Sequence, residues 1–150
     1  MIVICGGGTG GHLAIARSFC DELNRRDIKP IFIGSTSGQD KFWFENDENF
    51  LQKFFLPSSG VVNKRGFAKL KSLTNIVNLA LKCRKIFKQN DVKAVISVGG
   101  YSAAPAAIAA IISKVPLFIH EQNAVMGKLN KILKSNNLLK EEDFNISDMV

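Results

Sequence analysis

The sequence has few cysteines and no long apolar run. Its three cysteines, Cys5, Cys20 and Cys83, are scattered without CxxC spacing, which argues against a disulfide framework or a zinc site. We expect all three to be small buried residues. The longest apolar stretch, residues 103–112, contains Pro105 and is far short of the ~20 residues that span a bilayer. The first residues have no basic flank, so we expect no signal peptide.

Acidic residues are scarcer than basic ones, and aromatic rings other than phenylalanine are rare. The 20 Lys and Arg residues against 13 Asp and Glu residues give a net charge of +7. This excess favours an anionic partner: nucleic acid, acidic lipid or a phosphorylated substrate. With one Trp, one Tyr and no recognisable nucleic-acid motif, we expect no nucleic-acid partner. The 150 residues, 46% of them hydrophobic, suffice for one soluble globular domain.

What the sequence has instead is an alternation of short apolar runs and helical patterns, repeated about every thirty residues. We expect strands at 2–5, 30–33, 50–56, 92–98 and 115–120, and helices at 13–23, 39–49, 67–89, 102–113 and 124–133. This alternation predicts an α/β fold, a Rossmann-like parallel sheet with helices on both faces. The core-facing stripe of the long helix is expected at Leu73, Val77, Ala80, Cys83 and Phe87.

The first expected strand ends in the glycine-rich turn Gly6-Gly7-Gly8-Thr9-Gly10-Gly11-His12. Such a backbone approaches a ligand closely, and the N–H groups at the following helix start attract an anion, typically phosphate. The turn satisfies G-x-G-x-x-G, but residues 33–36 supply no acid for a dinucleotide fingerprint. A P-loop would have Lys and then Ser or Thr where His12 and Leu13 stand. A tight turn without a ligand is the remaining alternative.

Two more polar loops follow the fourth and fifth expected strands, at residues 99–102 and 120–123. Ligands of parallel sheets bind at the carboxyl ends of the strands, so the three loops should converge on one crevice. Ser102 also suits a helix N-cap, and His120 suits a structural anchor of its loop. Four hydrogen-bonding side chains in a row at 120–123 favour recognition of a sugar or nucleotide.

Together the three loops resemble those of the MurG family of bacterial cell-wall glycosyltransferases. The resemblance lies in Gly-Gly-Thr-Gly-Gly-His at 7–12, Ser-Val-Gly-Gly-Tyr-Ser-Ala-Ala-Pro at 97–105 and His-Glu-Gln-Asn-Ala at 120–124, and it covers residues 1–134. It implies the first half of a two-domain, GT-B type fold. It also implies an inverting hexosyl transfer in peptidoglycan synthesis, from UDP-N-acetylglucosamine (UDP-GlcNAc) to the muramyl 4-hydroxyl of undecaprenyl-pyrophosphoryl-MurNAc-pentapeptide (lipid I), to give lipid II.

The resemblance also implies roles for residues. Contacts with UDP-GlcNAc are expected from Thr9, Gly10, Gly11 and Asn123. The acceptor pyrophosphate is expected at Gly7, Gly8, Gly10, Gly11, His12, Gly99, Gly100, Tyr101 and Ser102. An inverting transfer needs one base, and we expect His12, since a helix N-terminus lowers the pKa of its imidazole and helps keep it neutral. Glu121 is the second candidate, and a role for His12 in binding or orienting the acceptor is the alternative. No metal or cofactor is expected.

A basic segment at residues 64–93 mixes cations with apolar residues that do not all fit one core-facing stripe. Such a segment suits adsorption to an anionic membrane surface. The MurG family is similar in lying peripherally on the cytoplasmic face of the bacterial inner membrane. A solvated basic helix is the alternative. The cations expected to face the membrane are Lys64, Arg65, Lys69, Lys82 and Lys85.

Residues 1–134 are therefore expected to form an acceptor-binding, membrane-associating domain, and residues 135–150 a divergent tail. The donor-binding C-terminal domain of the family is expected to be absent from this sequence. We accordingly expect the isolated chain to be inactive or nearly so. The alternative is a non-catalytic membrane-anchoring subunit of a split glycosyltransferase.

Overall fold

The computed structural model describes residues 1–58 and 67–121, with residues 67–72 described as backbone only. Within these ranges, five strands form one sheet in the order β3-β2-β1-β4-β5, and each neighbouring pair is parallel. The predicted parallel α/β fold is confirmed. The strands are β1 (Ile2–Cys5), β2 (Ile31–Ser35), β3 (Gln52–Leu56), β4 (Ala94–Ser97) and β5 (Leu117–Ile119).

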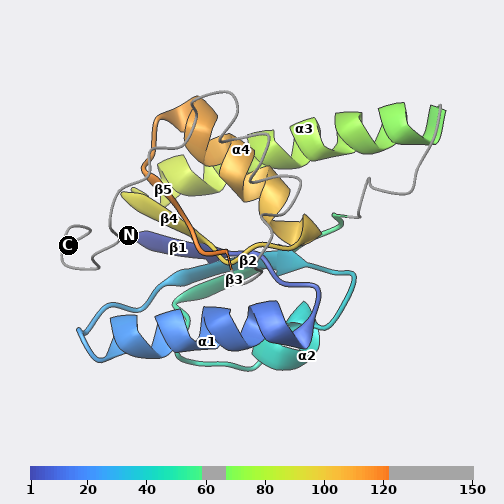
Figure 1. Ribbon diagram of the computed structural model, residues 1–150. Coiled ribbons are helices and arrows are strands. Elements are labelled where there is room, and N and C mark those ends of the chain that lie inside the picture. The colour runs from blue at the N-terminus through green and yellow to red at the C-terminus, as the bar shows by residue number, and fades with distance from the viewer. Residues whose placement is uncertain (59–66, 122–150) are drawn as a thin grey trace.

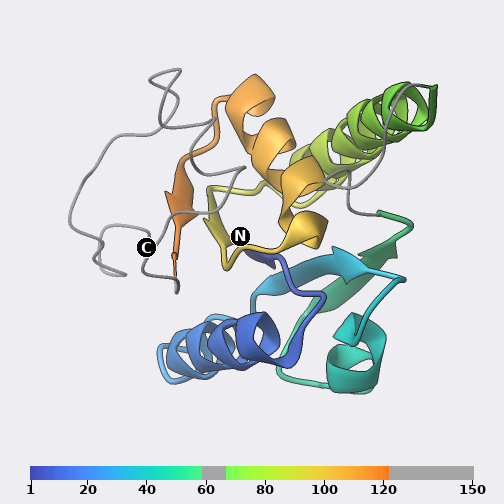
Figure 2. The same cartoon turned by 45° about the vertical axis from the view of Figure 1, so that its right-hand side comes forward.

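Helices cover both faces of the sheet, as predicted. Helices α1 (Gly10–Asn24) and α2 (Asp40–Phe44) lie on one face, and α3 (Phe67–Gln89) and α4 (Ala104–Ser113) lie on the other (Figures 1 and 2). A single 3₁₀ turn, η1 (Tyr101–Ala103), precedes α4. The helix predicted at 124–133 lies outside the described residues.

The strands divide their side chains between two cores. Val3 and Cys5 of β1 join the cluster beneath α3 and α4, whereas Ile2 and Ile4 join the cluster beneath α1 and α2. This division follows from the two-residue period of a strand, and it explains why β1 is apolar at every position. On the α1 and α2 side, Phe32 of β2 contacts three other phenylalanine rings, those of Phe44, Phe50 and Phe55.

The core face of α3 differs from the predicted stripe. Its buried residues are Leu79, Ala80, Cys83, Ile86 and Phe87, whereas Leu73 and Val77 are 46% and 55% exposed. The physical reason is that the N-terminal half of α3 projects beyond the sheet, so a periodic apolar residue there has no strand beneath it among the described residues (Figure 1). The C-terminal half packs on α4, whose buried Ala106, Ala109 and Ala110 allow close approach.

The three cysteines are free and buried, as expected. Burial raises the pKa of each thiol, to about 12 for both Cys20 and Cys83, and strongly for Cys5. Since the thiolate is the reactive form, these side chains act as core residues. In the described part of the chain, no helix combines the length and apolar character needed to cross a membrane.

Candidate active site at the carboxyl edge of the sheet

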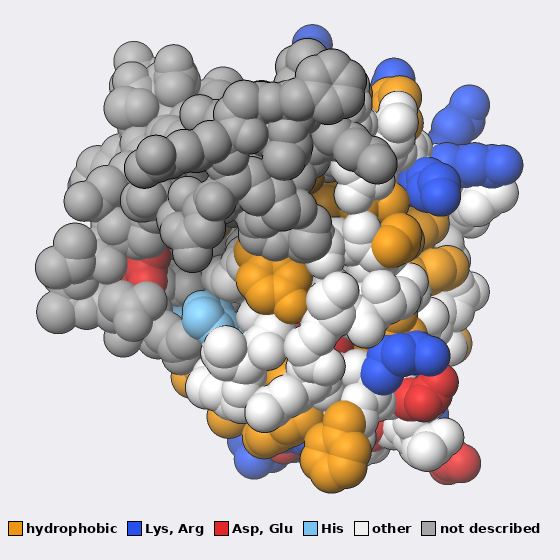
Figure 3. All heavy atoms as spheres, turned by 90° about the vertical axis from the view of Figure 1, so that its right-hand side faces the viewer, with side chains coloured by type: hydrophobic (Ala, Val, Ile, Leu, Met, Phe, Trp, Pro, Cys, Tyr) orange, Lys and Arg blue, Asp and Glu red, His pale blue; other side chains and the backbone are white. Residues whose placement is uncertain are grey.

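The candidate site lies where the chain changes direction in the sheet. From β1 the chain passes to β2 and then β3 on one side, and it returns to place β4 on the other side of β1. Loops that leave adjacent strands in opposite directions open a crevice at this topological switch point. The loops after β1 and β4 flank that point, and the β5 loop follows. Figure 3 looks onto this edge, where a histidine side chain reaches the surface.

The first three N–H groups of the glycine turn after β1 donate hydrogen bonds to acceptors within the protein. Gly6 donates to the carbonyl of Ile33 at 3.2 Å and Gly7 to that of Gly99 at 3.1 Å. Gly8 donates to Oδ1 of Asp40 at 2.5 Å. All three glycines have positive φ, which a side chain would disfavour. The predicted roles of Gly7 and Gly8 at the acceptor pyrophosphate stay predictions, and in this arrangement their N–H groups already have partners.

The start of α1 offers the donors that the turn does not. Its first intrahelical hydrogen bond runs from the N–H of Leu13 to the carbonyl of Thr9. The N–H groups of Gly10, Gly11 and His12 come before the hydrogen-bonded part of the helix. Among the described residues they have no backbone acceptor, and the Thr9 side chain does not cap them. Free N–H groups at the positive end of a helix dipole suit an anion. The structure thus brings predicted site residues 9–12 to one helix terminus.

His12 lies between the first two loops. Its Nδ1 is 2.8 Å from the hydroxyl oxygen of Thr9, and a Cβ atom added at Gly99 would lie 3.1 Å from its Nε2. When Nδ1–H donates to Thr9, the basic lone pair is on Nε2, on the side of the β4 loop. Burial lowers the pKa of His12, while the negative charges of Glu121 and Asp40 act in the opposite direction. A neutral imidazole near physiological pH is what a general base requires.

The loop after β4 packs directly on the glycine turn. Gly99 and Gly100 both have positive φ, and a Cβ atom on Gly100 would collide with the carbonyl oxygen of Gly7. The Tyr101 ring lies against Gly8, and its hydroxyl donates to the carbonyl of Ser37 at 2.8 Å. Ser102 does not cap α4, because that helix begins at Ala104 and its N-cap residue is Ala103. Its buried hydroxyl has no hydrogen-bond partner among the described residues.

The loop after β5 reaches the same edge. The N–H of His120 donates to the carbonyl of Ser97 at 2.8 Å, and its ring meets Phe19 of α1 edge-on, which supports the structural role considered for it. The Glu121 charge acts on the imidazole of His12, so the two candidate bases are neighbours. Asn123, predicted to contact UDP-GlcNAc, lies outside the described residues.

Asp40 is the residue of this site that the sequence analysis missed. It is fully buried and accepts hydrogen bonds from Gly8 of the glycine turn and from Ser35 at the end of β2. Its one signal in the sequence is an acid in the first turn of a short helix, which is also an ordinary position for a solvated carboxylate. The described residues contain no group of three or more His, Cys, Asp or Glu side chains placed to hold a metal ion.

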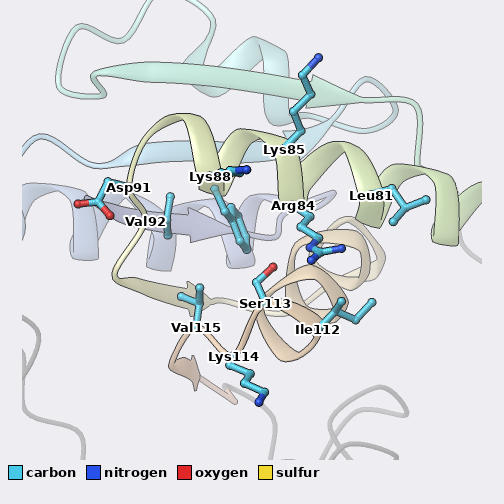
Figure 4. A pocket seen from close by; sticks show the side chains of 11 residues that line it. Leu81, Arg84, Lys85, Lys88, Asp91, Val92, Ile112, Ser113, Lys114 and Val115 are labelled. Carbon is cyan, nitrogen blue, oxygen red and sulfur yellow. The ribbon is translucent and has the colours of Figure 1, made fainter.

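A second surface feature lies between α3 and α4. A pocket of about 680 Å³ is lined by apolar side chains, among them Leu81 and Ile112, and by cations, among them Arg84. Arg84 reaches from α3 toward α4, whereas Lys85 points away from α4 (Figure 4). Of the cations predicted to face the membrane, Lys82 and Lys85 are exposed. Lys64 and Arg65 lie outside the described residues, and Lys69 is described only as backbone.

A parallel α/β sheet with helices on both faces and glycine loops meeting at its switch point defines the class of Rossmann-like domains. Within that class, the chain belongs to glycosyltransferase family 28: residues 2–137 match the model of its N-terminal domain. The resemblance to MurG noted from the three loops is thereby confirmed at the level of the family.

Curated relatives agree with this assignment. Over 133 residues the chain is 62% identical to the UDP-N-acetylglucosamine–N-acetylmuramyl-(pentapeptide) pyrophosphoryl-undecaprenol N-acetylglucosamine transferase of Campylobacter hominis. It is 53% identical to the protein of the same name from Wolinella succinogenes. Each alignment covers 89% of this chain but only 39% and 40% of the relatives. The crystal structure of Acinetobacter baumannii MurG matches with a TM-score of 0.75 and 27% identity, over 89% of this chain and 38% of that one.

Proposed function

We propose that this chain supplies the acceptor-binding half of an inverting N-acetylglucosaminyl transferase that acts on UDP-GlcNAc and lipid I to give lipid II. The observation that carries the proposal is the placement of His12 between the free N–H groups of α1 and the Gly99 loop. Residues 1–134 would form the acceptor domain. The donor-binding domain would correspond to the remaining three fifths of the relatives' length.

The site residues then have distinct tasks. The N–H groups of Gly10, Gly11 and His12, together with the loop from Gly99 to Ser102, hold the acceptor pyrophosphate. His12 Nε2 accepts the proton of the muramyl 4-hydroxyl as its oxygen attacks the anomeric carbon, and the bond to UDP breaks on the opposite face. Glu121 supports the positive charge that His12 gains, or serves as the base itself. Thr9 and Asn123 complete the contacts with UDP-GlcNAc.

A chimaera tests the catalytic proposal. Residues 1–134 would replace the matching segment of the Campylobacter hominis relative, which is 62% identical, and lipid II formation would be measured. The chimaera should turn over, and His12→Gln should lower kcat about 10²- to 10⁴-fold, the usual contribution of a general base. Ser18→Ala, on the exposed side of the same helix, is the control. Full activity of His12→Gln would rule out His12 as the base and leave Glu121→Gln as the next variant.

The peripheral location at the cytoplasmic membrane face is a further part of the proposal. It is supported by Leu73, Val77 and Leu81, which are exposed at four-residue spacing on α3. The same helix carries the exposed cations Lys82, Arg84 and Lys85. Figure 3 shows Lys and Arg side chains gathered on the α3 side. Apolar residues beside cations favour insertion into an anionic lipid interface.

Vesicle binding tests this part. The 150-residue chain should sediment with phosphatidylglycerol vesicles, more weakly with phosphatidylcholine, and less at high salt. Leu81→Ser and Lys85→Gln should each weaken the binding to phosphatidylglycerol. Phe42→Ser is the matched control, because Phe42 is 91% exposed but lies on α2, on the other face of the sheet. Equal losses for Leu81→Ser and Phe42→Ser would contradict a specific α3 surface.

A further inference from the structure

The burial of the Asp40 carboxylate beside a proposed anion site needs a physical explanation. Asp40 is fully inaccessible to solvent, and it belongs to a site whose proposed ligand is an anion. Burying a charge is costly unless hydrogen bonds satisfy it. A negative charge at this place also opposes the binding of a pyrophosphate. Some other contribution must therefore outweigh both costs.

The two oxygens of Asp40 join two loops. Oδ1 accepts the N–H of Gly8 at 2.5 Å, and Oδ2 accepts the N–H of Ser35 at 2.6 Å. Both are short, charge-assisted hydrogen bonds, which are stronger than neutral ones. The glycine turn after β1 is thereby fixed to the carboxyl end of β2 through one side chain.

Glycines leave the space that this carboxyl group occupies. A Cβ atom added at Gly7 would lie 2.7 Å from Oδ1, and one added at Gly34 would lie 2.7 Å from Oδ2. Gly7 is thus explained by Asp40 rather than by direct contact with a ligand, and Gly34 is explained by Asp40 together with the Phe32 ring, whose Cε1 would lie 2.5 Å from the added Cβ. The glycine turn and the carboxylate form one packed unit.

The direction of the Gly8 N–H sets the backbone path from Thr9 into α1. Because it points inward to Asp40, the chain leaves the turn at Thr9 in an extended conformation and then enters α1. The N–H groups of Gly10, Gly11 and His12 consequently begin the helix beside the Gly99 loop, against which His12 packs. Without an inward acceptor, the Gly8 N–H would be buried and unpaired or would turn outward, and either change would move the start of α1.

We propose that Asp40 is a positioning residue of the acceptor site: its carboxylate fixes the glycine turn so that the first turn of α1 and the His12 ring face the β4 loop. This inference rests on the proposed pyrophosphate site. It separates two contributions of one side chain, because the charge of Asp40 repels the ligand while its hydrogen bonds build the surface that holds the ligand.

The two contributions of Asp40 have opposite effects on the affinity for pyrophosphate, and this difference can be tested. Asp40→Asn removes the negative charge and leaves only one of the two acceptor oxygens. If charge were all that mattered, inorganic pyrophosphate would bind this variant more tightly than the wild-type chain. If Asp40 positions the loop, pyrophosphate binds more weakly despite the lost repulsion. Glu45→Gln is the matched control, because Glu45 is an exposed carboxylate of the adjoining turn that pairs with Lys41.

The experiment is an NMR titration of the 150-residue chain with pyrophosphate, followed at the amides of Gly10 and Gly11, with amide hydrogen exchange measured at Gly8 and Ser35. In Asp40→Asn we expect weaker pyrophosphate binding and exchange about ten- to a hundredfold faster at Gly8 and Ser35, the range for a lost hydrogen bond to a charged group. Glu45→Gln should change neither rate. Unchanged or tighter pyrophosphate binding by Asp40→Asn overturns the inference.

Two other experimental outcomes also test the role of Asp40. If the wild-type chain does not bind pyrophosphate, the proposed acceptor site fails, and the exchange rates alone judge Asp40: acceleration at Gly8 and Ser35 supports the positioning role, and unchanged rates overturn it. If Asp40→Asn does not fold, the wild-type chain is measured instead. Scalar coupling across the hydrogen bonds should join the Asp40 carboxyl carbon to the amide nitrogens of Gly8 and Ser35, and its absence overturns the inference.

Discussion

Replacing Gly100 by alanine tests whether the two glycine loops are held together by direct backbone contact. Gly100 has φ +81° and ψ 167°, a region open essentially to glycine alone, where another residue costs about 1–3 kcal/mol. The new Cβ would also overlap the carbonyl oxygen of Gly7, and such overpacking costs about 1–3 kcal/mol more. The sum, about 2–6 kcal/mol, is a large part of the ~5–15 kcal/mol that stabilises an ordinary domain.

Urea unfolding followed by circular dichroism measures this loss. With a slope of about 1–3 kcal/mol per molar urea, the midpoint of Gly100→Ala should fall by at least about 0.7 M. Gly10→Ala is the matched control, because Gly10 is helical and its new Cβ would approach Gln39 no closer than 3.4 Å. That variant should be neutral or gain up to about 1 kcal/mol. Equal midpoints for Gly100→Ala and the wild-type chain would refute the argument that these loops are in obligatory contact.

Three further predictions concern the core, the loop contact and pH. Phe32→Ala should cost about 3–5 kcal/mol of unfolding free energy, while Phe42→Ala, at an exposed position, should stay within about 0.5 kcal/mol of wild type; a similar loss in both would contradict the assigned core. Tyr101→Phe keeps the ring and removes the hydrogen bond to Ser37, so it should cost about 1 kcal/mol by thermal unfolding, and no change would show that water replaces it. The pKa of His12 is lowered from 6.5, so the unfolded chain takes up this proton at higher pH than the folded chain; stability should fall as pH drops through 6.5, and less steeply in His12→Gln. Parallel pH profiles of the two chains would contradict that linkage.

The order of strands and helices could be predicted because each strand of the inner sheet is a short apolar run ended by polar or glycine residues. Residues 2–5 and 94–97 are buried at every position, so their composition alone indicates parallel strands. The convergence of the loops after β1, β4 and β5 followed from the rule for parallel sheets rather than from any contact in the sequence.

The face of α3 could not be predicted, because helical periodicity says which residues share a side but not how far the sheet extends beneath them. Leu73 and Val77 share the period of a buried stripe and lie where the helix has left the sheet. Asp40 escaped for a related reason. Its partners are the backbone N–H groups of Gly8 and Ser35. Almost every residue type has a backbone N–H, so the sequence does not reveal these partners.

The pairing of β1 with β4 has a consequence for synthesis of the chain. In the β1–β4 pairing, Ile2 lies opposite Ala94. The central strand β1 is synthesised first, and it can pair with β4 only after the ribosome has passed residue 97. At ~5–20 residues per second this interval is on the order of ten seconds. Throughout it, one edge of an entirely apolar strand is unpaired, a state prone to association with other chains. Contacts of such long sequence separation also slow folding, so a nascent chain of this family is expected to engage chaperones before its sheet closes.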